Sequence, residues 1–499
     1  MKKFIERFSS LVKGTITGFD RIVFKGFVLP LMHAKGAMQF CGMRGILNKN
    51  YKSWMIEQSA SISKAADEYG KKNCGKDVVS LPTWRIRKEE LAHNQQKAEQ
   101  IESGLIGIWS CLEAASSYRA RYCEKSGYPQ LRSYQTRCKH LYFYFDHRDY
   151  GFMNIRLQTW FPYHIQVCLN GREWLRRSLE RHNIEFLAHG NKFLHISDYD
   201  KAQTFLNKQL DVRFTKILDG FVPIVFPTMK EVLGPHLSYY WTMWQSEWAT
   251  DLVFPSPAAL NNIMDSLLRH AHLTGTSTQV LRYLDRPLTL AGKPDGRSKD
   301  QVLTRLTDFN DGIRVRHWVD KNSAKVYNQQ NVLRVETTIN DPGKFRVFRH
   351  KKGQSVDNEK SRLPMRKGVM DIPLRAKISQ EVNDRFMDDL STLKDQSPAR
   401  NLINQITRHQ THNGRRFRSL DPTGKDRELL LSLSNPKFRI SGLTNKMLRQ
   451  SLSDAKFGQG ITQKQLSAKI SRHLRLLRVH GMIRKSIKAF VVRSGVFDI

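Results

Sequence analysis

Apolar and polar positions recur with different periods along the chain, and these periods predict its elements. Residues 15–30 alternate on both sides of a Gly-Phe-Asp sequence and predict two short strands joined by a turn. Residues 52–125 contain long stretches without Gly or Pro, with apolar residues at helical spacing, and predict a mostly helical region. Residues 140–171 alternate again, as in a β-hairpin or meander, and a helix is expected at 171–183.

The second half of the chain combines further strands and helices. Residues 236–254 and the two short runs within 322–340 alternate as strands do, and 257–272 has the spacing of a helix. Residues 346–374 are basic with few large apolar residues, which is typical of a linker or arm, and a helix is expected at 375–394.

The C-terminal block contains the clearest motif. One expected helix has an apolar stripe formed by Leu466, Ile470, Leu474 and Leu477. Cations surround this stripe: Lys464, Lys469, Arg472, Arg475 and Arg478. Gly481 ends the helix, and two short strands follow, with Arg484 and Lys485 at a basic tip. The stretch RHLRLLRVHGMIRK resembles the winged helix-turn-helix of bacterial MarR- and ArsR-type regulators.

This resemblance implies a recognition helix in a DNA major groove with the wing beside it. Earlier helices of the same block are expected at 426–434 and 443–452. Residues 401–499 contain 20 Lys+Arg and 5 Asp+Glu, so this block alone has a net charge near +15. DNA binding is the leading expectation, and RNA binding or protein contacts through the same fold are the alternatives.

These segments together predict an α+β multidomain protein. Its expected parts are a mixed α/β domain at 1–210, an α/β domain at 211–345, a basic linker plus helix at 346–400 and a winged helix-turn-helix at 401–499.

The charge of the chain indicates its partner. The sequence has 82 Lys+Arg against 46 Asp+Glu, a net charge of +36. Such a surface repels itself unless a polyanion neutralises it, and nucleic acid and anionic membrane are the two usual polyanions. The sequence has no run of eighteen apolar residues and no apolar signal-peptide core. We therefore expect DNA or RNA as partner, no membrane, and a cytoplasmic location.

The six cysteines suggest neither a zinc site nor a disulfide framework. None of them forms a CxxC pair, which zinc sites usually need. A large basic chain without a secretion signal is an unusual place for disulfides. We expect reduced cysteines.

The hairpin NSAKVYNQQNVLRVETTIN at 322–340 carries an unusual set of ionisable residues. Alternation places Arg334 and Glu336 on one face of their strand, and Lys325 and Tyr327 share a face of the other strand. In the strand at 236–254, Glu247 and Asp251 share a face. If these strands are neighbours, the candidate metal ligands Glu247, Asp251 and Glu336 converge. Carboxylates gather only around positive charge, which Mg²⁺ or Mn²⁺ would supply, and such sites cut phosphodiesters.

The order of these segments resembles the core of phage and plasmid rolling-circle replication initiators. SEWATD, the helix at 257–272, KVYNQQ and LRVE follow one another as the corresponding pieces do in those families, over ~110 of the 499 residues. The resemblance implies strand nicking with a divalent metal and a tyrosine nucleophile, for which Tyr327 is one candidate and Tyr239 or Tyr240 are others. KVYNQQ departs from the family by a Gln where the family turn has Lys, and this region has no HxH pair. The block patterns are also similar to those of a group of bacterial proteins of unknown function.

The same residues have simpler interpretations. Glu336 could belong to a structural ion network with arginines such as Arg316, and His317 could be a packed histidine. Asp20 could be a first metal carboxylate of a ribonuclease-H-like nuclease, but a turn or helix-capping role fits the pattern better. Asp146, His147 and Asp149 fit a polar hairpin turn better than a metal cluster.

The sequence thus favours a nucleic-acid-processing protein of a mobile element or plasmid-like system. In this hypothesis Glu247, Asp251 and Glu336 bind the metal, Lys325 and Arg334 stabilise phosphate charge, and Tyr327 attacks. The alternative is a non-catalytic DNA- or RNA-binding protein, either a regulator or part of a ribonucleoprotein. Candidate nucleic-acid contacts are Arg156, Trp160, Arg172, Arg314, Arg316, Arg334, Lys464, Lys469, Arg472, Arg475, Arg478, Arg484 and Lys485.

Overall fold

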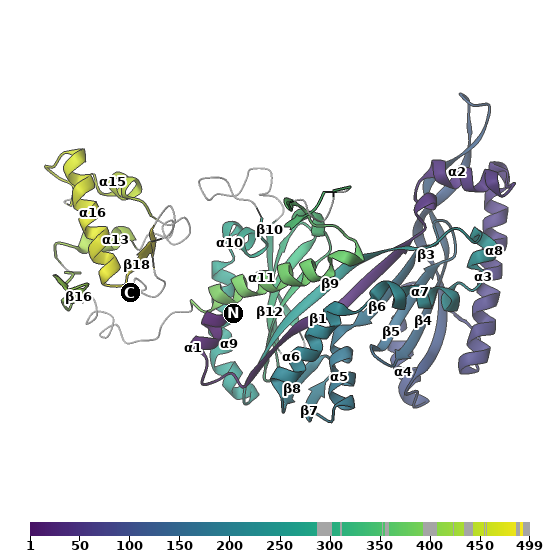
Figure 1. Cartoon of the computed structure of the whole chain (residues 1–499), viewed down its shortest axis with the longest axis horizontal. Coiled ribbons are helices and arrows are strands. Elements are labelled where there is room, and N and C mark those ends of the chain that lie inside the picture. The colour runs from purple at the N-terminus through teal and green to yellow at the C-terminus, as the bar shows by residue number, and fades with distance from the viewer. Residues whose placement is uncertain are drawn as a thin grey trace. The chain divides into compact units, whose positions relative to one another are not determined.

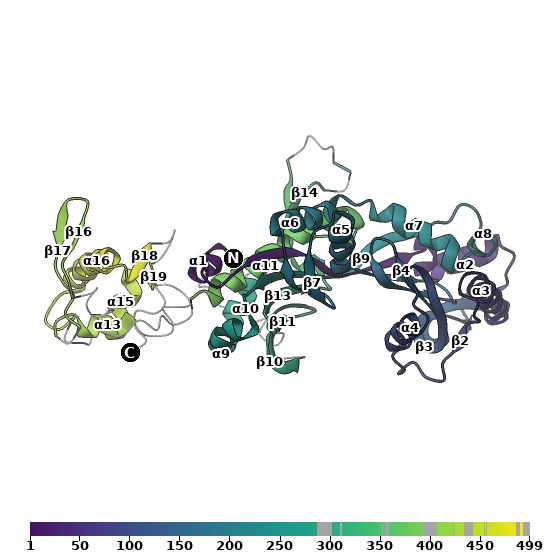
Figure 2. The same ribbon diagram turned by 90° about the horizontal axis from the view of Figure 1, so that it is seen from below.

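The computed structural model describes most of the chain. The described residues are 1–286, 302–309, 312–351, 353–354, 359–392, 407–422, 424–433, 443–453, 455, 457–485 and 490–492. They form an α+β protein with a large sheet (Figures 1 and 2). The chain divides into two compact units: unit 1 comprises 1–9, 261–320 and 384–499, and unit 2 comprises 10–260 and 321–383.

Unit 2 is built on a sheet with the strand order β12-β13-β9-β1-β6-β5-β4-β3-β2. Its strands are β1 (Gly14–Phe27), β2 (Val79–Ser80), β3 (Gly104–Cys123), β4 (Tyr128–His147), β5 (Gly151–Gln158), β6 (Ile165–Asn170), β9 (Tyr240–Val253), β12 (Asn322–Gln329) and β13 (Val332–Ile339). Neighbouring strands are antiparallel except for β2 and β3. Because β1 pairs with β9, the segments expected as separate domains at 1–210 and 211–345 share one sheet.

Helices and short hairpins complete unit 2. Its helices are α2 (Ala34–Met43), α3 (Tyr51–Cys74), α4 (Lys88–Ala98), α5 (Gly171–Arg181), α6 (Tyr199–Lys208), α7 (Phe214–Val225) and α8 (Met229–Leu233). In two hairpins outside the large sheet, β7 (Phe186–His189) pairs with β8 (Lys192–Ile196), and β14 (Arg346–Arg349) pairs with β15 (Ser361–Pro364). Helices α9 (Pro257–Thr274) and α11 (Ile372–Leu390) lie near the helices expected at 257–272 and 375–394.

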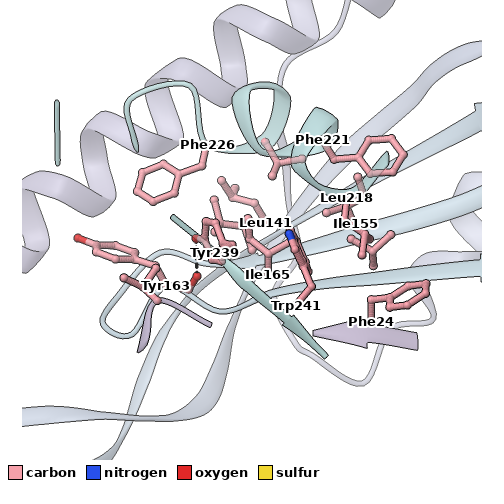
Figure 3. Packing of buried hydrophobic residues seen from close by; sticks show 14 of the residues in the cluster. Phe24, Leu141, Ile155, Tyr163, Ile165, Leu218, Phe221, Phe226, Tyr239 and Trp241 are labelled. Carbon is pink, nitrogen blue, oxygen red and sulfur yellow. Dashed lines mark hydrogen bonds between the residues drawn. The ribbon is translucent and has the colours of Figure 1, made fainter. Parts of the chain in front are cut away.

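The main core of unit 2 lies on one face of this sheet. Buried residues of β1, β4, β5 and β6 pack against α7 and the segments that flank it (Figure 3). Polar atoms of the aromatic residues in this layer have partners: the Tyr239 hydroxyl donates to the Tyr163 carbonyl at 2.7 Å, and Trp241 Nε1 donates to Asp219 at 2.7 Å. The burial of so many aromatic side chains removes this face from solvent. Two smaller apolar clusters also pack against the sheet, one with α5 and α6 and one with α4.

Two secondary-structure expectations are wrong. The mostly helical region expected to extend to residue 125 ends earlier, because 104–123 form β3, which pairs with β4 along its whole length. Residues 15–30 contain one continuous strand, β1, rather than two around a turn. Asp20 lies in an irregularity of this strand, where the β1–β9 pairing shifts between Phe19 and Arg21. A β-bulge of this kind re-aims a side chain without ending the strand.

Unit 1 contains α1 (Lys2–Arg7), α10 (Ser277–Tyr283) and the pair β10 (Val302–Phe309) and β11 (Gly312–Val319). Asp389 connects its helices, because its carboxylate accepts hydrogen bonds from Thr274, Gln279 and Tyr283. His317 packs beside Tyr283 and Phe386, and burial lowers its pKa to about 4.

The C-terminal block of unit 1 has its own apolar core. Its elements are β16 (Gln410–His412), β17 (Arg415–Phe417), α13 (Arg427–Leu433), α15 (Asn445–Leu452), α16 (Gln463–Val479), β18 (Ile483–Lys485) and β19 (Phe490–Val492). The helices expected at 426–434 and 443–452 are present, and the expected long helix ends next to Gly481, which has a φ of 71°. Among the described residues, no helix is long and apolar enough to cross a membrane. The six cysteines are free thiols, as expected.

Candidate functional site

The register of β12, β13 and β9 gathers the ionisable residues of the hairpin on one face. Tyr327 lies opposite Arg334, and Arg334 lies opposite Asp251. Lys325 precedes Tyr327 by two residues and lies opposite Glu336, which follows Arg334 by two residues. Since side chains two residues apart share a face, both rows lie on the same side of the sheet. The sorting of this hairpin by alternation is confirmed.

Arg334 and Asp251 form the centre of this cluster. Arg334 Nε donates to Asp251 Oδ1 at 2.6 Å and Nη2 donates to Oδ2 at 2.9 Å. The side chains of Asp251 and Arg334 are 0% and 2% exposed. Burial disfavours the Arg334 cation, yet Asp251 and Asp20 hold its pKa well above the ordinary value. This bidentate geometry is the strong form of an arginine–carboxylate pair.

Helix α5 supplies the second arginine of the cluster. Arg172 Nη2 lies 3.0 Å from Asp251 Oδ2 and also donates to the Ala249 carbonyl. Asn170 caps α5 by accepting from the Arg172 amide, which fixes the start of the helix beside the sheet. Gly171 permits this approach, since a Cβ there would lie 2.2 Å from the Phe19 carbonyl oxygen. Arg172 is therefore a member of a buried ion cluster and is not at the surface.

Asp20 joins the same cluster from β1. Its Oδ1 lies 3.2 Å from Arg334 Nη1 and accepts a hydrogen bond from Asn191 at 3.0 Å. Its position in the bulge of β1 turns the carboxylate toward Arg334. Sequence reasoning set Asp20 aside as a turn or capping residue. The signal that could have found it is its place inside an otherwise strand-like run, GFDRIVFKG.

Glu336 is bound on both sides by its own hairpin. Lys325 forms an ion pair with Oε1, and the Tyr327 hydroxyl donates to Oε2 at 2.7 Å. Burial would raise the pKa of Glu336, but Lys325 and Tyr327 lower it below its ordinary value. Burial and the Glu336 charge raise the pKa of Tyr327 well above 10. Tyr327 is thus a buried, protonated phenol in this arrangement.

Glu247 is the carboxylate of the predicted set that reaches an open space. It lines a cavity of about 330 Å³ together with Asp20, Arg21 and Cys168, and neither Asp251 nor Glu336 lines this cavity. Burial and the nearby charges of Glu336 and Asp20 raise the pKa of Glu247. Gln245 donates to its carboxylate at 3.0 Å. Lys325 and Arg21 offset part of this effect, but the pKa of Glu247 stays above its ordinary value.

The predicted metal ligands are neighbours but do not share one open centre. Glu247 and Glu336 are close enough to influence each other's charge, whereas Asp251 is bound by two arginines. Within the part of the chain that the structure describes, no group of three or more His, Cys, Asp or Glu residues could hold a metal ion.

The predicted nucleic-acid contacts fall into buried and accessible groups. Arg172 and Arg334 are buried in the ion cluster, which does not fit a role in surface contacts. The side chain of Arg156 is 32% exposed, and its Nη2 lies 3.5 Å from Glu113 Oε2. Trp160 packs against the core. In unit 1, Arg314 lies over Phe309 and Arg316 lies over Trp318, and both arginines are half-buried.

Helix α16 presents a basic face to solvent. Its apolar residues Leu466, Ile470, Leu474 and Leu477 are buried in the block's core, as expected. The side chains of Lys464, Arg472, Arg475 and Arg478 are exposed. Lys469 instead donates to the Phe457 carbonyl at 2.7 Å. Arg484 and Lys485 are in β18, and their side chains lie outside the described residues.

Two features fix the position of α16. A capping box at Thr462 and Gln465 begins the helix. Asn445 of α15 donates to the Ser467 carbonyl at 2.8 Å and to the Ser471 hydroxyl at 2.9 Å. Arg475 and Arg478 line a cavity of about 470 Å³ with Asn445 and Ser471. The basic face is therefore held in a defined orientation within its block.

The β3–β4 hairpin is a second basic surface. Its tip extends past α2 (Figure 1). Arg119 lies directly opposite Arg132, and its guanidinium is 4.1 Å from the ring of Tyr134. Like charges directly opposite one another destabilise a sheet, so a bound polyanion would stabilise this hairpin.

Comparison of the chain with models of known protein families, with curated proteins and with solved structures found no match.

Proposed function

We propose that the protein binds nucleic acid and that α16 is its contact with duplex DNA. The observation that carries this proposal is the division of α16 into a buried apolar face and an exposed face with Lys464, Arg472, Arg475 and Arg478. Among the described residues of the block, α13, α15 and α16 come after the β16–β17 hairpin and are followed by the β18–β19 hairpin, and this run of helices with a closing hairpin is compatible with a winged helix. Phosphate neutralisation by such cations supplies most of the affinity for DNA and makes it salt-dependent.

The net charge of +36 supports the same proposal from the whole chain. The cations within the exposed face of α16 repel one another, as do those within the β3–β4 hairpin, and a polyanion bound at either place removes this repulsion. A winged helix used for protein contacts would have no need of this excess of positive charge.

The test is the binding of full-length protein to labelled duplex DNA over a range of salt concentrations. The variant Arg472→Gln/Arg475→Gln/Arg478→Gln removes three exposed cations from α16. The control Lys64→Gln/Lys216→Gln/Lys230→Gln removes three exposed cations from helices of unit 2. We expect the α16 variant to lower the slope of log K against log salt by about 2 to 3 and the control to change it little. Equal slopes for the two variants would refute the proposed contact.

A second candidate function is metal-dependent cleavage of a nucleic-acid strand. The specific observation in its favour is Glu247, whose carboxylate lines a cavity beside Asp20 and whose pKa is raised by Glu336 and Asp20. Mg²⁺ is commonly held by one or two carboxylates with water in its remaining positions, and Glu247 and Asp20 fit that donor set. Glu247 and Asp20 would hold the ion at the cavity, with Arg21 beside them, and the ion would polarise a phosphate.

This candidate has two readouts. Mg²⁺ or Mn²⁺ should raise the melting temperature of the wild type but not of Glu247→Gln, and nicking of supercoiled plasmid should disappear in the same variant and in EDTA. Exposed Glu57→Gln on α3 is the matched control. Salt-sensitive binding without metal stabilisation or cleavage would leave a non-catalytic binding protein.

A further inference from the structure

Two lysines from distant parts of unit 2 lie over one tryptophan ring. Lys25 Nζ on β1 is 4.7 Å from the centroid of the Trp244 ring on β9, and Lys367 Nζ is 4.4 Å from the same centroid. Lys25 Nζ also lies 5.4 Å from the ring of Phe27. Trp244 itself is 39% exposed, so this group of side chains is open to solvent on one side.

The backbone fixes this arrangement. The β1–β9 pairing shifts between Val23 and Phe24, which leaves Trp244 without a directly opposite residue. The Met243 amide donates to the Lys367 carbonyl at 2.8 Å, which holds the segment with Lys367 beside β9. Because these contacts are made by main-chain atoms, the two ammonium groups are held near each other by the fold.

The positive charges of Lys25, Lys367 and Arg156 are not balanced by nearby carboxylates. Burial lowers the pKa of Lys25, and the positive charges of Arg156 and Lys367 lower it further. Among the described residues, neither Lys25 nor Lys367 forms an ion pair with a carboxylate. Glu113 lies 3.5 Å from Arg156, but it also pairs with Lys88 and accepts a hydrogen bond from Tyr142. Cation–ring contacts offset only part of the cost of such a group.

We propose that Lys25, Lys367 and Arg156 form a phosphate-binding site and that its ligand is a phosphodiester of a single nucleic-acid strand. The identity of the polymer rests on the proposed function, whereas phosphate binding rests on the geometry of these cations. An anion among them would replace repulsion by attraction. The ammonium groups of Lys25 and Lys367 and the guanidinium of Arg156 would approach it from two strands and a loop.

The site has a defined relation to the cavity at Glu247. Lys25 follows Arg21 by four residues on β1, so alternation places both side chains on the same face of the strand. At about 3.3 Å per residue they are about 13 Å apart. Arg21 lies opposite Glu247 in the β1–β9 register and lines the cavity. A strand bound at Lys25 and running along β1 would therefore reach the carboxylates Glu247 and Asp20.

The experiment uses the full chain and two ligands, inorganic pyrophosphate and a labelled single-stranded oligonucleotide. The variants are Lys25→Gln, Lys367→Gln and the double variant, and the control is Lys216→Gln/Lys230→Gln, which removes the same charge from exposed positions. The lysine variants remove mutually repelling cations, so their melting temperatures without ligand should equal or exceed that of the wild type. This comparison shows whether each variant is folded.

We expect pyrophosphate to raise the melting temperature of the wild type and the control but not of the double variant. The double variant should also lower the salt slope for the single strand by about 1.4, since each neutralised phosphate contributes about 0.7. Unchanged pyrophosphate stabilisation and an unchanged slope in the double variant would overturn the proposed site.

Failure of the proposed function would look different. If no nucleic acid binds but pyrophosphate stabilisation depends on Lys25 and Lys367, the phosphate site stands and its ligand is a small phosphate compound. If the α16 variant loses duplex binding but retains pyrophosphate stabilisation, the two sites are independent.

Discussion

At the scale of single residues, the ion cluster depends on Asp251. Its carboxylate is completely buried and contacts both Arg172 and Arg334. The two buried guanidinium groups therefore share Asp251 as their main carboxylate partner. Asp20 is a second partner, at 3.2 Å from Arg334 Nη1 and 3.8 Å from Arg172 Nε. Such a cluster specifies how β9, β13 and α5 meet, and removing one member leaves an uncompensated buried charge.

We predict that Asp251→Ala lowers the free energy of unfolding by about 3 to 5 kcal/mol. Chemical denaturation of full-length protein measures this change. Asp200→Ala, at an exposed position of α6, is the control and should change stability by less than about 0.5 kcal/mol. A cost below about 1 kcal/mol for Asp251→Ala would show that the arginines find other partners.

Buried histidines give the protein a pH-dependent stability. His140 on β4 is buried, and burial and the charge of Arg156 lower its pKa to about 4. Its Nε2 has no hydrogen-bond partner among the described residues. The unfolded chain therefore binds a proton near pH 6.5 that the folded chain accepts only near pH 4.

Because the folded pKa is the lower one, stability is fully present above about pH 6.5 and is lost as the pH falls toward 4. The difference in pKa corresponds to roughly 3 kcal/mol at its limit. We predict that His140→Gln makes unfolding free energy less dependent on pH between 6.5 and 4, as measured by denaturation at a series of pH values. Exposed His189→Gln should leave the wild-type dependence intact; an equal effect of both variants would argue against this assignment.

Local patterns could predict part of this cluster. Alternation correctly paired Lys325 with Tyr327 and Arg334 with Glu336 on shared faces. It could not find Arg172, which comes from a helix distant in sequence, or the role of Asp20, because a bulge becomes visible only when both neighbouring strands are known.

At the scale of elements, the approach of α5 to β1 determines whether Arg172 reaches Asp251. Gly171 lies where the helix begins, and the absence of a side chain there lets the helix contact the Phe19 carbonyl. The sequence predicted the helix but gave no sign of this close approach, since a glycine at a helix start is common for other reasons.

We predict that Gly171→Ala destabilises the protein by about 1 to 3 kcal/mol, because its Cβ would displace α5 from β1. Gly220→Ala in α7 is a control with the opposite sign. Its Cβ would meet no atom within 4 Å, so it should stabilise by about 0.5 to 1 kcal/mol through helix propensity. Thermal unfolding of both variants tests this; stabilisation by Gly171→Ala would contradict the close approach.

The long strand β3 shows why helical spacing misled the prediction for 104–123. Its sequence GLIGIWSCLEAASSYRARYC lacks regular alternation, because its first part is buried on both faces and its last part is exposed. Pairing with β4 overrides the local preference, and this non-local contact is absent from any short window of sequence.

At the scale of the whole molecule, the chain order does not follow the compact units. Unit 1 collects segments from the beginning, middle and end of the sequence. The expected boundary near residue 210 came from the order of predicted strands and helices, which does not reveal that β9, β12 and β13 extend the sheet begun by β1. The C-terminal elements were predictable because their contacts are local and their caps are standard.

For the whole molecule we propose nucleic-acid binding through exposed cations of α16, with a phosphate site on the sheet face of unit 2. The most direct measurement is hydrogen–deuterium exchange of the full chain with and without a saturating duplex that has a single-stranded extension, at low and high salt. We predict salt-sensitive protection at the solvent-facing part of 463–479 and around Lys25 and Lys367, with unchanged exchange in α7. Protection confined to other segments, or no salt-dependent protection at all, would contradict the account.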